Sequence, residues 1–92
     1  MRIRWTDPAA RDLTQICDYI HERDAPAAAR RMALRIFEGV TSLKLFPRRG
    51  RMGRVPNTRE LAFPGLPYLV IYRVGEDVIE IVRILHGAQK WP

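Results

Sequence analysis

One histidine and three arginines are the side chains in this sequence best suited to chemistry on a phosphodiester. An imidazole titrates near neutral pH, so His86 is the best candidate for a general acid or base. Arg59, Arg73 and Arg83 lie on predicted neighbouring strands and could contact phosphate, because a planar guanidinium matches its oxygens. Together these residue types suit RNA cleavage by the 2′-hydroxyl, in which a base removes the hydroxyl proton and cations stabilise the phosphate.

A second group of side chains could bind RNA or another target around that centre. Lys90 and Trp91 follow His86 and could supply a cation and a surface on which a base stacks. Residues 47–57 form a loop that is rich in Gly, Pro and Arg. The candidate target-binding residues in this loop are Arg48, Arg49, Arg51 and Arg54.

His86, Arg73 and Arg83 each have a structural alternative. His86 directly follows a predicted strand, where a histidine can also serve packing alone. Arg73 and Arg83 could instead form ion pairs across the sheet. Their candidate partners there are the carboxylates of Glu60 and Glu80.

Metal and nucleotide-cofactor chemistry have no support in the sequence. The 2 histidines are isolated and the carboxylates are scattered, so they form no ligand set. The single cysteine, Cys17, excludes both a cysteine-based zinc site and an internal disulfide. Gly50 and Gly53 lack the strand and helix that a phosphate-binding glycine loop requires. We therefore expect neither a metal nor a cofactor.

Length and charge narrow the class of protein. With 92 residues, 47% of them hydrophobic and 28% charged, the chain predicts one globular domain over residues 1–92. The 16 Lys and Arg exceed the 10 Asp and Glu by a net charge of +6, and all but Lys44 and Lys90 are arginine. Such a field attracts nucleic acid, membrane surfaces or acidic proteins. No apolar stretch predicts a membrane span or a signal peptide, so we expect a cytoplasmic protein without a membrane partner.

Hydrophobic periodicity predicts a short strand followed by two helices. Residues 2–5 alternate in the manner of a strand. Asp7 can cap a helix over residues 8–23, whose apolar residues recur at helical spacing. A second helix is expected over residues 26–45, ended by Pro47. The short link between the helices predicts an antiparallel hairpin.

The second half of the chain has the period and composition of strands. Strands are predicted over residues 58–63, 68–74 and 78–85, as a three-stranded antiparallel meander. The last two are apolar on both faces, so we expect them at the centre of the sheet. Strands that are grouped after helices predict an α+β fold, in which a small twisted sheet packs on the helix hairpin.

Several short motifs follow one another along almost the whole chain. They are Trp5-Thr6, Pro8-Ala9-Ala10, Asp18-Tyr19-Ile20, Arg59-Glu60-Leu61, Tyr68, Val70-Ile71-Tyr72-Arg73-Val74 and His86-Gly87-Ala88. In this order they resemble the RelE/ParE superfamily of bacterial toxins from type II toxin–antitoxin modules, which includes plasmid stabilisation proteins.

This resemblance implies a growth-arresting toxin that a smaller partner protein neutralises. Antitoxins of this kind wrap an acidic, extended or helical C-terminal segment around the toxin, and the net charge of +6 fits such a partner. Grooves between the helix hairpin and the sheet would receive its apolar side chains. A heterotetramer of two toxins and two antitoxins is compatible with the sequence.

The superfamily contains two mechanisms. RelE-like members cut mRNA in the ribosome, whereas ParE-like members inhibit DNA gyrase by binding. RelE-like nucleases usually carry an arginine directly after the tyrosine that opens the central strand, but here Leu69 follows Tyr68. The lysine pair of RelE also has no counterpart, since Arg51 and Arg54 are the nearest cations.

The incomplete nuclease set favours gyrase inhibition over cleavage. An mRNA endonuclease remains the alternative, so the sequence leaves open whether the chain is an enzyme. A basic RNA-binding module without toxicity is the third interpretation.

Overall fold

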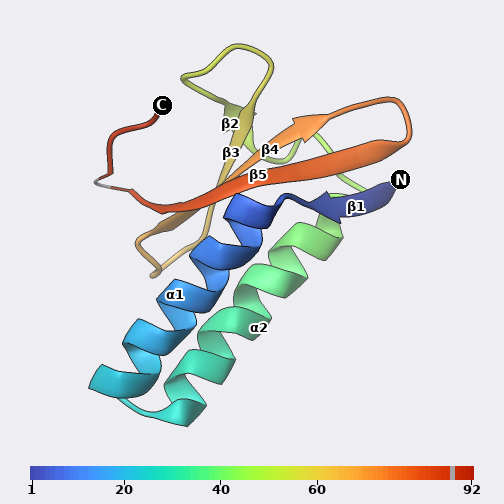
Figure 1. Cartoon of the computed structure of the whole chain (residues 1–92). Helices are drawn as coiled ribbons and strands as arrows, with labels where there is room; N and C mark the ends of the chain where they lie inside the picture. The colour runs from blue at the N-terminus through green and yellow to red at the C-terminus, as the bar shows by residue number, and fades with distance from the viewer. Residues whose placement is uncertain (88) are drawn as a thin grey trace.

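The chain folds as an α+β structure of two helices and a five-stranded sheet (Figure 1). The computed structural model describes residues 1–87 and 89–92. Ala88, the last residue of the motif that begins at His86, lies outside the described residues. The elements are β1 (Arg2–Trp5), α1 (Asp7–Arg23), α2 (Pro26–Ser42), β2 (Arg51–Met52), β3 (Arg59–Ala62), β4 (Tyr68–Val74) and β5 (Val78–His86).

The two helices form the predicted hairpin, side by side on one side of the sheet (Figure 1). Their ends differ from the prediction. Thr6 caps α1 in place of Asp7, because the Thr6 hydroxyl accepts a hydrogen bond from the Ala9 N–H at 3.2 Å. Helix α2 ends at Ser42 and not at residue 45, because residues 43–45 make tighter backbone hydrogen bonds, each to the carbonyl three residues earlier.

The sheet has the strand order β1-β5-β4-β3-β2. β1 is parallel to β5, and the other neighbouring strands are antiparallel. The sequence predicted the inner positions of β4 and β5 correctly but missed β2, whose two residues lie in the Gly-, Pro- and Arg-rich loop. In β5 the register shifts, since Ile71 pairs with Arg83 and Tyr72 with Ile81, so Val82 is an extra residue in a bulge.

The core lies between the helices and one face of the sheet. Its members include Met32, Ile36 and Val40 of α2 and, from the inner strands, Val70, Tyr72, Ile79 and Ile81. Trp5 and Cys17 pack at its border.

The other face of the sheet is also covered in part. Ile71 alternates with the core residues Val70 and Tyr72 and therefore points away from the helices, yet it is fully buried. Figure 1 shows the C-terminal segment turning back on this side of the sheet.

Gly39 allows α2 to approach the sheet closely. A Cβ atom at this position would lie 2.7 Å from Cζ of Phe63, which follows β3. We expect Gly39→Ala to lower the free energy of unfolding by about 1 to 3 kcal/mol through overpacking. This loss should exceed the gain of about 1 kcal/mol from the higher helix propensity of alanine. Chemical denaturation measures the change, and a variant more stable than the wild type would contradict the close packing.

Candidate functional site

His86 lies in a pocket between α1 and the adjoining ends of β4 and β5. The pocket has a volume of about 300 Å³ and is lined in part by Tyr19, Tyr68 and His86. The strand register pairs Tyr68 with His86, and the two rings meet edge to face with centroids 6.0 Å apart. Burial, the main cause, raises the pKa of the Tyr68 hydroxyl, so it stays protonated and can donate a hydrogen bond at neutral pH.

Asp12 of α1 lines the same pocket and binds β5. Its Oδ2 atom accepts hydrogen bonds from Arg83 Nε at 2.6 Å and from the Ile84 N–H at 2.9 Å. Its Oδ1 atom accepts a bond from Arg83 Nη2 at 2.9 Å. β1 pairs with β5 only as far as Ile81, so Asp12 takes over a backbone donor beyond the end of β1. Arg83 is therefore paired with Asp12, not with Glu60 or Glu80.

Arg73 has the cross-strand partner that the sequence suggested. Its Nη1 atom lies 3.6 Å from Oε1 of Glu80 on β5. Glu80 also forms an ion pair and a hydrogen bond with Arg4 of β1. The register places Arg4, Glu80 and Arg73 in one row across three strands, which brings these charges together.

Arg59 supports the arginine-rich loop. Its Nη1 atom donates hydrogen bonds to the carbonyl oxygens of Gly50 at 2.8 Å and Arg48 at 3.4 Å. Among the four residues predicted as a nuclease centre, His86 and Arg83 line one pocket, whereas Arg59 and Arg73 do not line it. Of the three predicted arginines, the fold thus brings Arg83 into the pocket of His86, and Arg83 already binds the Asp12 carboxylate.

The buried hydroxyl of Tyr72 holds the start of the loop. It donates a hydrogen bond to the Pro47 carbonyl and accepts one from the Gly50 N–H, each at 2.8 Å. A Cβ at residue 50 would lie 2.8 Å from the Tyr72 ring, so this close approach requires glycine. Burial, the largest effect, raises the pKa of Tyr72 and keeps its hydroxyl protonated.

Glu60 of β3 holds the second part of the loop. Its side chain is 1% exposed and accepts hydrogen bonds from Arg51 Nη2 at 3.1 Å, the Arg54 N–H at 3.1 Å and Arg54 Nε at 3.3 Å. Burial alone would raise the pKa of Glu60, but these hydrogen bonds and the charge of Arg54 outweigh burial and lower it. Two of the predicted target-binding arginines therefore also fix the loop.

The remaining predicted target-binding residues lie at the surface. Arg48 and Lys90 are exposed, and Arg49 Nη1 donates a hydrogen bond to Ser42 Oγ at 2.7 Å. Trp91 is half-buried. Its indole nitrogen is buried and has no hydrogen-bond partner within the part of the chain that the structure describes.

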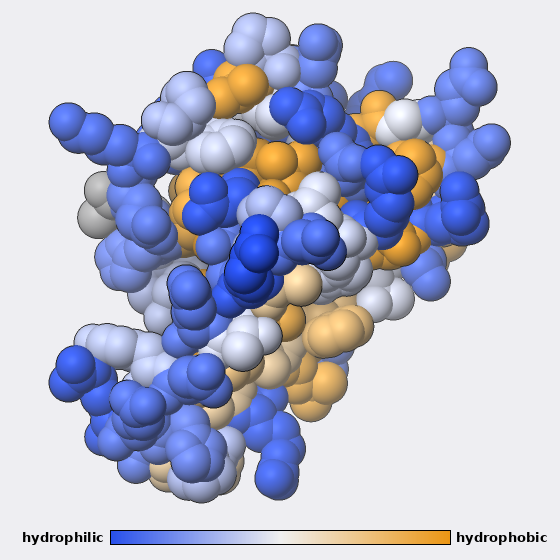
Figure 2. Space-filling model, in the orientation of Figure 1, coloured by the Kyte–Doolittle hydropathy of each residue, from blue (hydrophilic) through white to orange (hydrophobic). Residues whose placement is uncertain are grey.

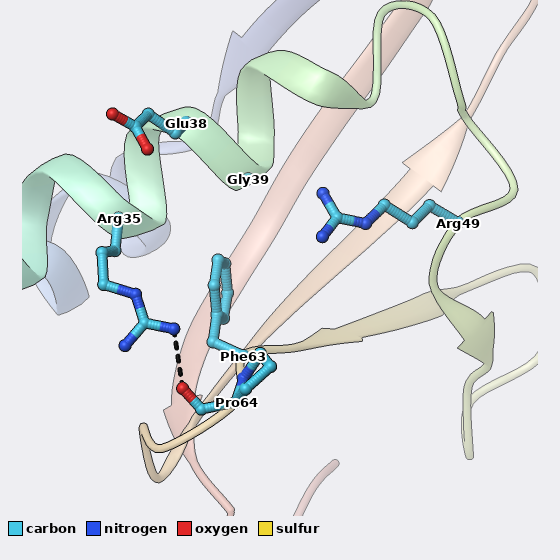
Figure 3. Close-up of a pocket in the computed structure, with 6 residues that line it drawn as sticks. All are labelled: Arg35, Glu38, Gly39, Arg49, Phe63 and Pro64. Carbon is cyan, nitrogen blue, oxygen red and sulfur yellow. Dashed lines mark hydrogen bonds between the residues drawn. The ribbon is translucent and has the colours of Figure 1, made fainter.

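A cavity that the sequence did not indicate lies between α2 and the turn after β3 (Figure 3). Its volume is about 220 Å³, and its lining residues are Arg35, Glu38, Gly39, Arg49, Phe63 and Pro64. An arginine on a helix surface is usually solvated, so Arg35 alone did not indicate a binding site. A glycine inside the apolar stripe of α2 was the one sign of a close approach at this place.

Residues 1–87 and 89–92 contain neither a cluster of metal-ligating side chains nor a membrane-spanning helix. No three His, Cys, Asp or Glu side chains lie together in a way that could hold a metal ion there. No helix in the same residues combines the length and apolar character needed to cross a membrane.

The ion pairs of Glu60 make stability depend on pH. The pKa of Glu60 in the folded state lies below the ordinary value of 4.5, so its contribution is complete above pH 4.5 and is lost as the pH falls through the folded pKa. We expect Glu60→Gln to lower the free energy of unfolding at pH 7 by about 1 to 3 kcal/mol. The difference from the wild type should shrink below pH 4.5.

Denaturation curves at several pH values measure this effect. Glu76→Gln, which alters an exposed carboxylate in the turn between β4 and β5, is the matched control and should change stability little. An equal loss in both variants, or a pH-independent difference, would contradict the role of Glu60.

The similarity of this chain to known proteins extends over both helices and all five strands. The family model described as the ParE toxin of type II toxin–antitoxin systems, parDE, matches residues 3–91. The candidate toxin Y4kP of Sinorhizobium fredii is 46% identical over 91 residues, which are 99% of this chain and 93% of that protein. Toxin RelE2 of Caulobacter vibrioides is 40% identical over 88 residues, which are 96% of this chain and 97% of that protein.

A solved structure of the chromosomal ParDE toxin–antitoxin system from P. aeruginosa has the same fold. It superposes with a TM-score of 0.86 at 32% identity, over 94% of this chain and 95% of that chain. The resemblance to RelE/ParE toxins that the motifs indicated is thus confirmed along nearly the whole sequence. The chain belongs to the ParE toxin family and is a toxin of a type II toxin–antitoxin system.

Proposed function

We propose that this toxin arrests growth by binding DNA gyrase in the cytoplasm, without cutting nucleic acid. The observation that supports this most is the engagement of its strand arginines. Arg83 is held by Asp12, Arg73 by Glu80, and Arg59 by carbonyls of the arginine-rich loop. RNA cleavage needs cations that can stabilise developing charge on phosphate. A guanidinium that already forms a two-point ion pair would have to leave its carboxylate first.

The sequence around Tyr68 supports the same mechanism. Leu69 occupies the place where RelE-like nucleases usually carry an arginine, and it pairs across the sheet with Ala62 and Leu85. An apolar residue there can stabilise the sheet, but it offers no charge to a phosphate.

A supercoiling assay with purified gyrase and relaxed plasmid tests the proposal. We expect the toxin to inhibit supercoiling, and His86→Ala to inhibit it as well, because binding needs no general acid or base. Toxin unfolded by heat is the negative control. Undiminished supercoiling at a large molar excess of folded toxin would overturn the proposal.

Cleavage of mRNA in the ribosome is the second candidate function. The pocket that joins His86, Tyr68 and Arg83 favours it, because an imidazole, which can act as a general acid or base, lies there with a hydroxyl and a cation. In a translation extract the same toxin preparation should leave mRNA intact. Cleavage that His86→Ala abolishes would select the nuclease mechanism instead.

An acidic antitoxin is the proposed partner that neutralises the toxin. The net charge of +6 favours an acidic segment, and heterotetramers with two copies of each protein are compatible with this. Figure 2 shows a mostly hydrophilic surface with an apolar strip beside the helix hairpin. Leu34 and Phe37 of α2 are among the exposed apolar residues, at 57% and 52%. Such side chains would receive apolar anchors of the antitoxin.

The affinity for the antitoxin should fall several-fold as ionic strength rises, because salt screens exposed charge pairs. The measurement is a titration of the protein encoded beside the toxin gene at low and high salt. An affinity that does not change with salt would show that apolar contacts dominate the interface.

A further inference from the structure

The cavity between α2 and the turn after β3 combines two cations with an aromatic wall. Figure 3 shows the guanidinium groups of Arg35 and Arg49 on either side of the Phe63 ring. Phe63 is 8% exposed and packs directly against Gly39, so the ring is a fixed wall. The two arginines come from different elements, since Arg35 belongs to α2 and Arg49 to the loop before β2.

Both guanidinium groups are already oriented by the fold. Arg35 Nη2 donates a hydrogen bond to the Pro64 carbonyl at 2.6 Å, and Arg49 Nη1 donates to Ser42 Oγ at 2.7 Å. A guanidinium has five N–H donors, so each keeps several that have no partner among residues 1–87 and 89–92. Because these side chains are held in place, a ligand would cost less conformational entropy on binding.

The local charge of the cavity is positive. Glu38 is the acidic residue in its lining, and Figure 3 shows its carboxylate pointing away from both guanidinium groups. A planar guanidinium binds a carboxylate through two parallel hydrogen bonds, which makes carboxylates suitable ligands. Leu34 directly precedes Arg35 on α2 and is 57% exposed, so the same helix also offers an apolar side chain at the surface. This combination suits an acidic peptide better than an inorganic anion.

We propose that Arg35 and Arg49 bind a carboxylate side chain from the acidic segment of the antitoxin, with a neighbouring apolar side chain against α2. This inference rests on the proposed neutralisation by an acidic partner. It assigns the cavity a ligand class, the aspartate or glutamate of a peptide, and it assigns the two arginines a role in recognition that is separate from the His86 pocket.

A peptide titration tests the cavity without the antitoxin. The probe is the capped tripeptide acetyl-Glu-Leu-Glu-amide, and its uncharged match is acetyl-Gln-Leu-Gln-amide. In two-dimensional NMR spectra we expect the glutamate peptide to shift the amide signals of Gly39, Arg49 and Phe63 in a saturable manner. The Arg35→Gln variant should lose this response. Equal shifts with both peptides, or shifts confined to other regions, would overturn the proposal.

Binding to the antitoxin itself is measured by calorimetry with the protein encoded beside the toxin gene. We expect Arg35→Gln and Arg49→Gln each to weaken binding about tenfold, as for loss of one charge-assisted contact. Arg30→Gln removes the same charge from an exposed site on α2 and should weaken binding much less. An equal loss of affinity in all three variants would show a general charge effect and would overturn the proposed role of the cavity.

The two proposals fail in different ways. If the wild-type toxin does not bind the protein encoded beside its gene, the proposed neutralisation by that partner is wrong. The proposal that this partner supplies the carboxylate is then wrong as well. If the wild type binds but Arg35→Gln and Arg49→Gln match the Arg30→Gln control, neutralisation stands and the cavity assignment is wrong. Thermal melts monitored by circular dichroism confirm that each variant is folded.

Discussion

The carboxylate of Asp12 is the contact on which the arrangement of helices and sheet depends. It accepts hydrogen bonds from the Arg83 side chain and the Ile84 backbone, and it thereby joins α1 to β5 just beyond the end of β1. The Asp12 side chain is only 11% exposed, so removing one partner would leave the other charge poorly solvated. The same ion pair holds Arg83, which lines the pocket of His86, in a structural role.

Arginines hold other parts of the fold in the same way. Arg51 and Arg54 neutralise the buried Glu60, while Arg59 supports the loop that Tyr72 anchors. Each of these contacts holds the arginine-rich loop against the sheet. The excess positive charge is left at the surface, where it can act through binding, and the cavity beside Arg35 is one such place.

Local pattern was enough to predict the helix hairpin and four of the five strands, because apolar periodicity reports which face of each element is buried. It also placed Tyr68 at the start of one strand and His86 directly after the next strand, which in the structure includes His86. The pairing of Asp12 with Arg83 spans 71 positions in the sequence, so no local pattern could reveal it. β2 was missed because glycine, proline and arginine around it indicate a loop, while its pairing depends on β3. The cavity requires Arg35 and Arg49 to meet across elements, which only the tertiary fold determines.

We propose that this toxin acts through a binding surface and not through cleavage. Mapping of RNA 5′ ends in cells that express the toxin without its antitoxin distinguishes the two mechanisms. If the toxin acts by binding, growth should stop without new RNA 5′ ends inside translated codons, both for the wild type and for His86→Ala. New ends within codons that appear with the wild type and vanish with His86→Ala would contradict it.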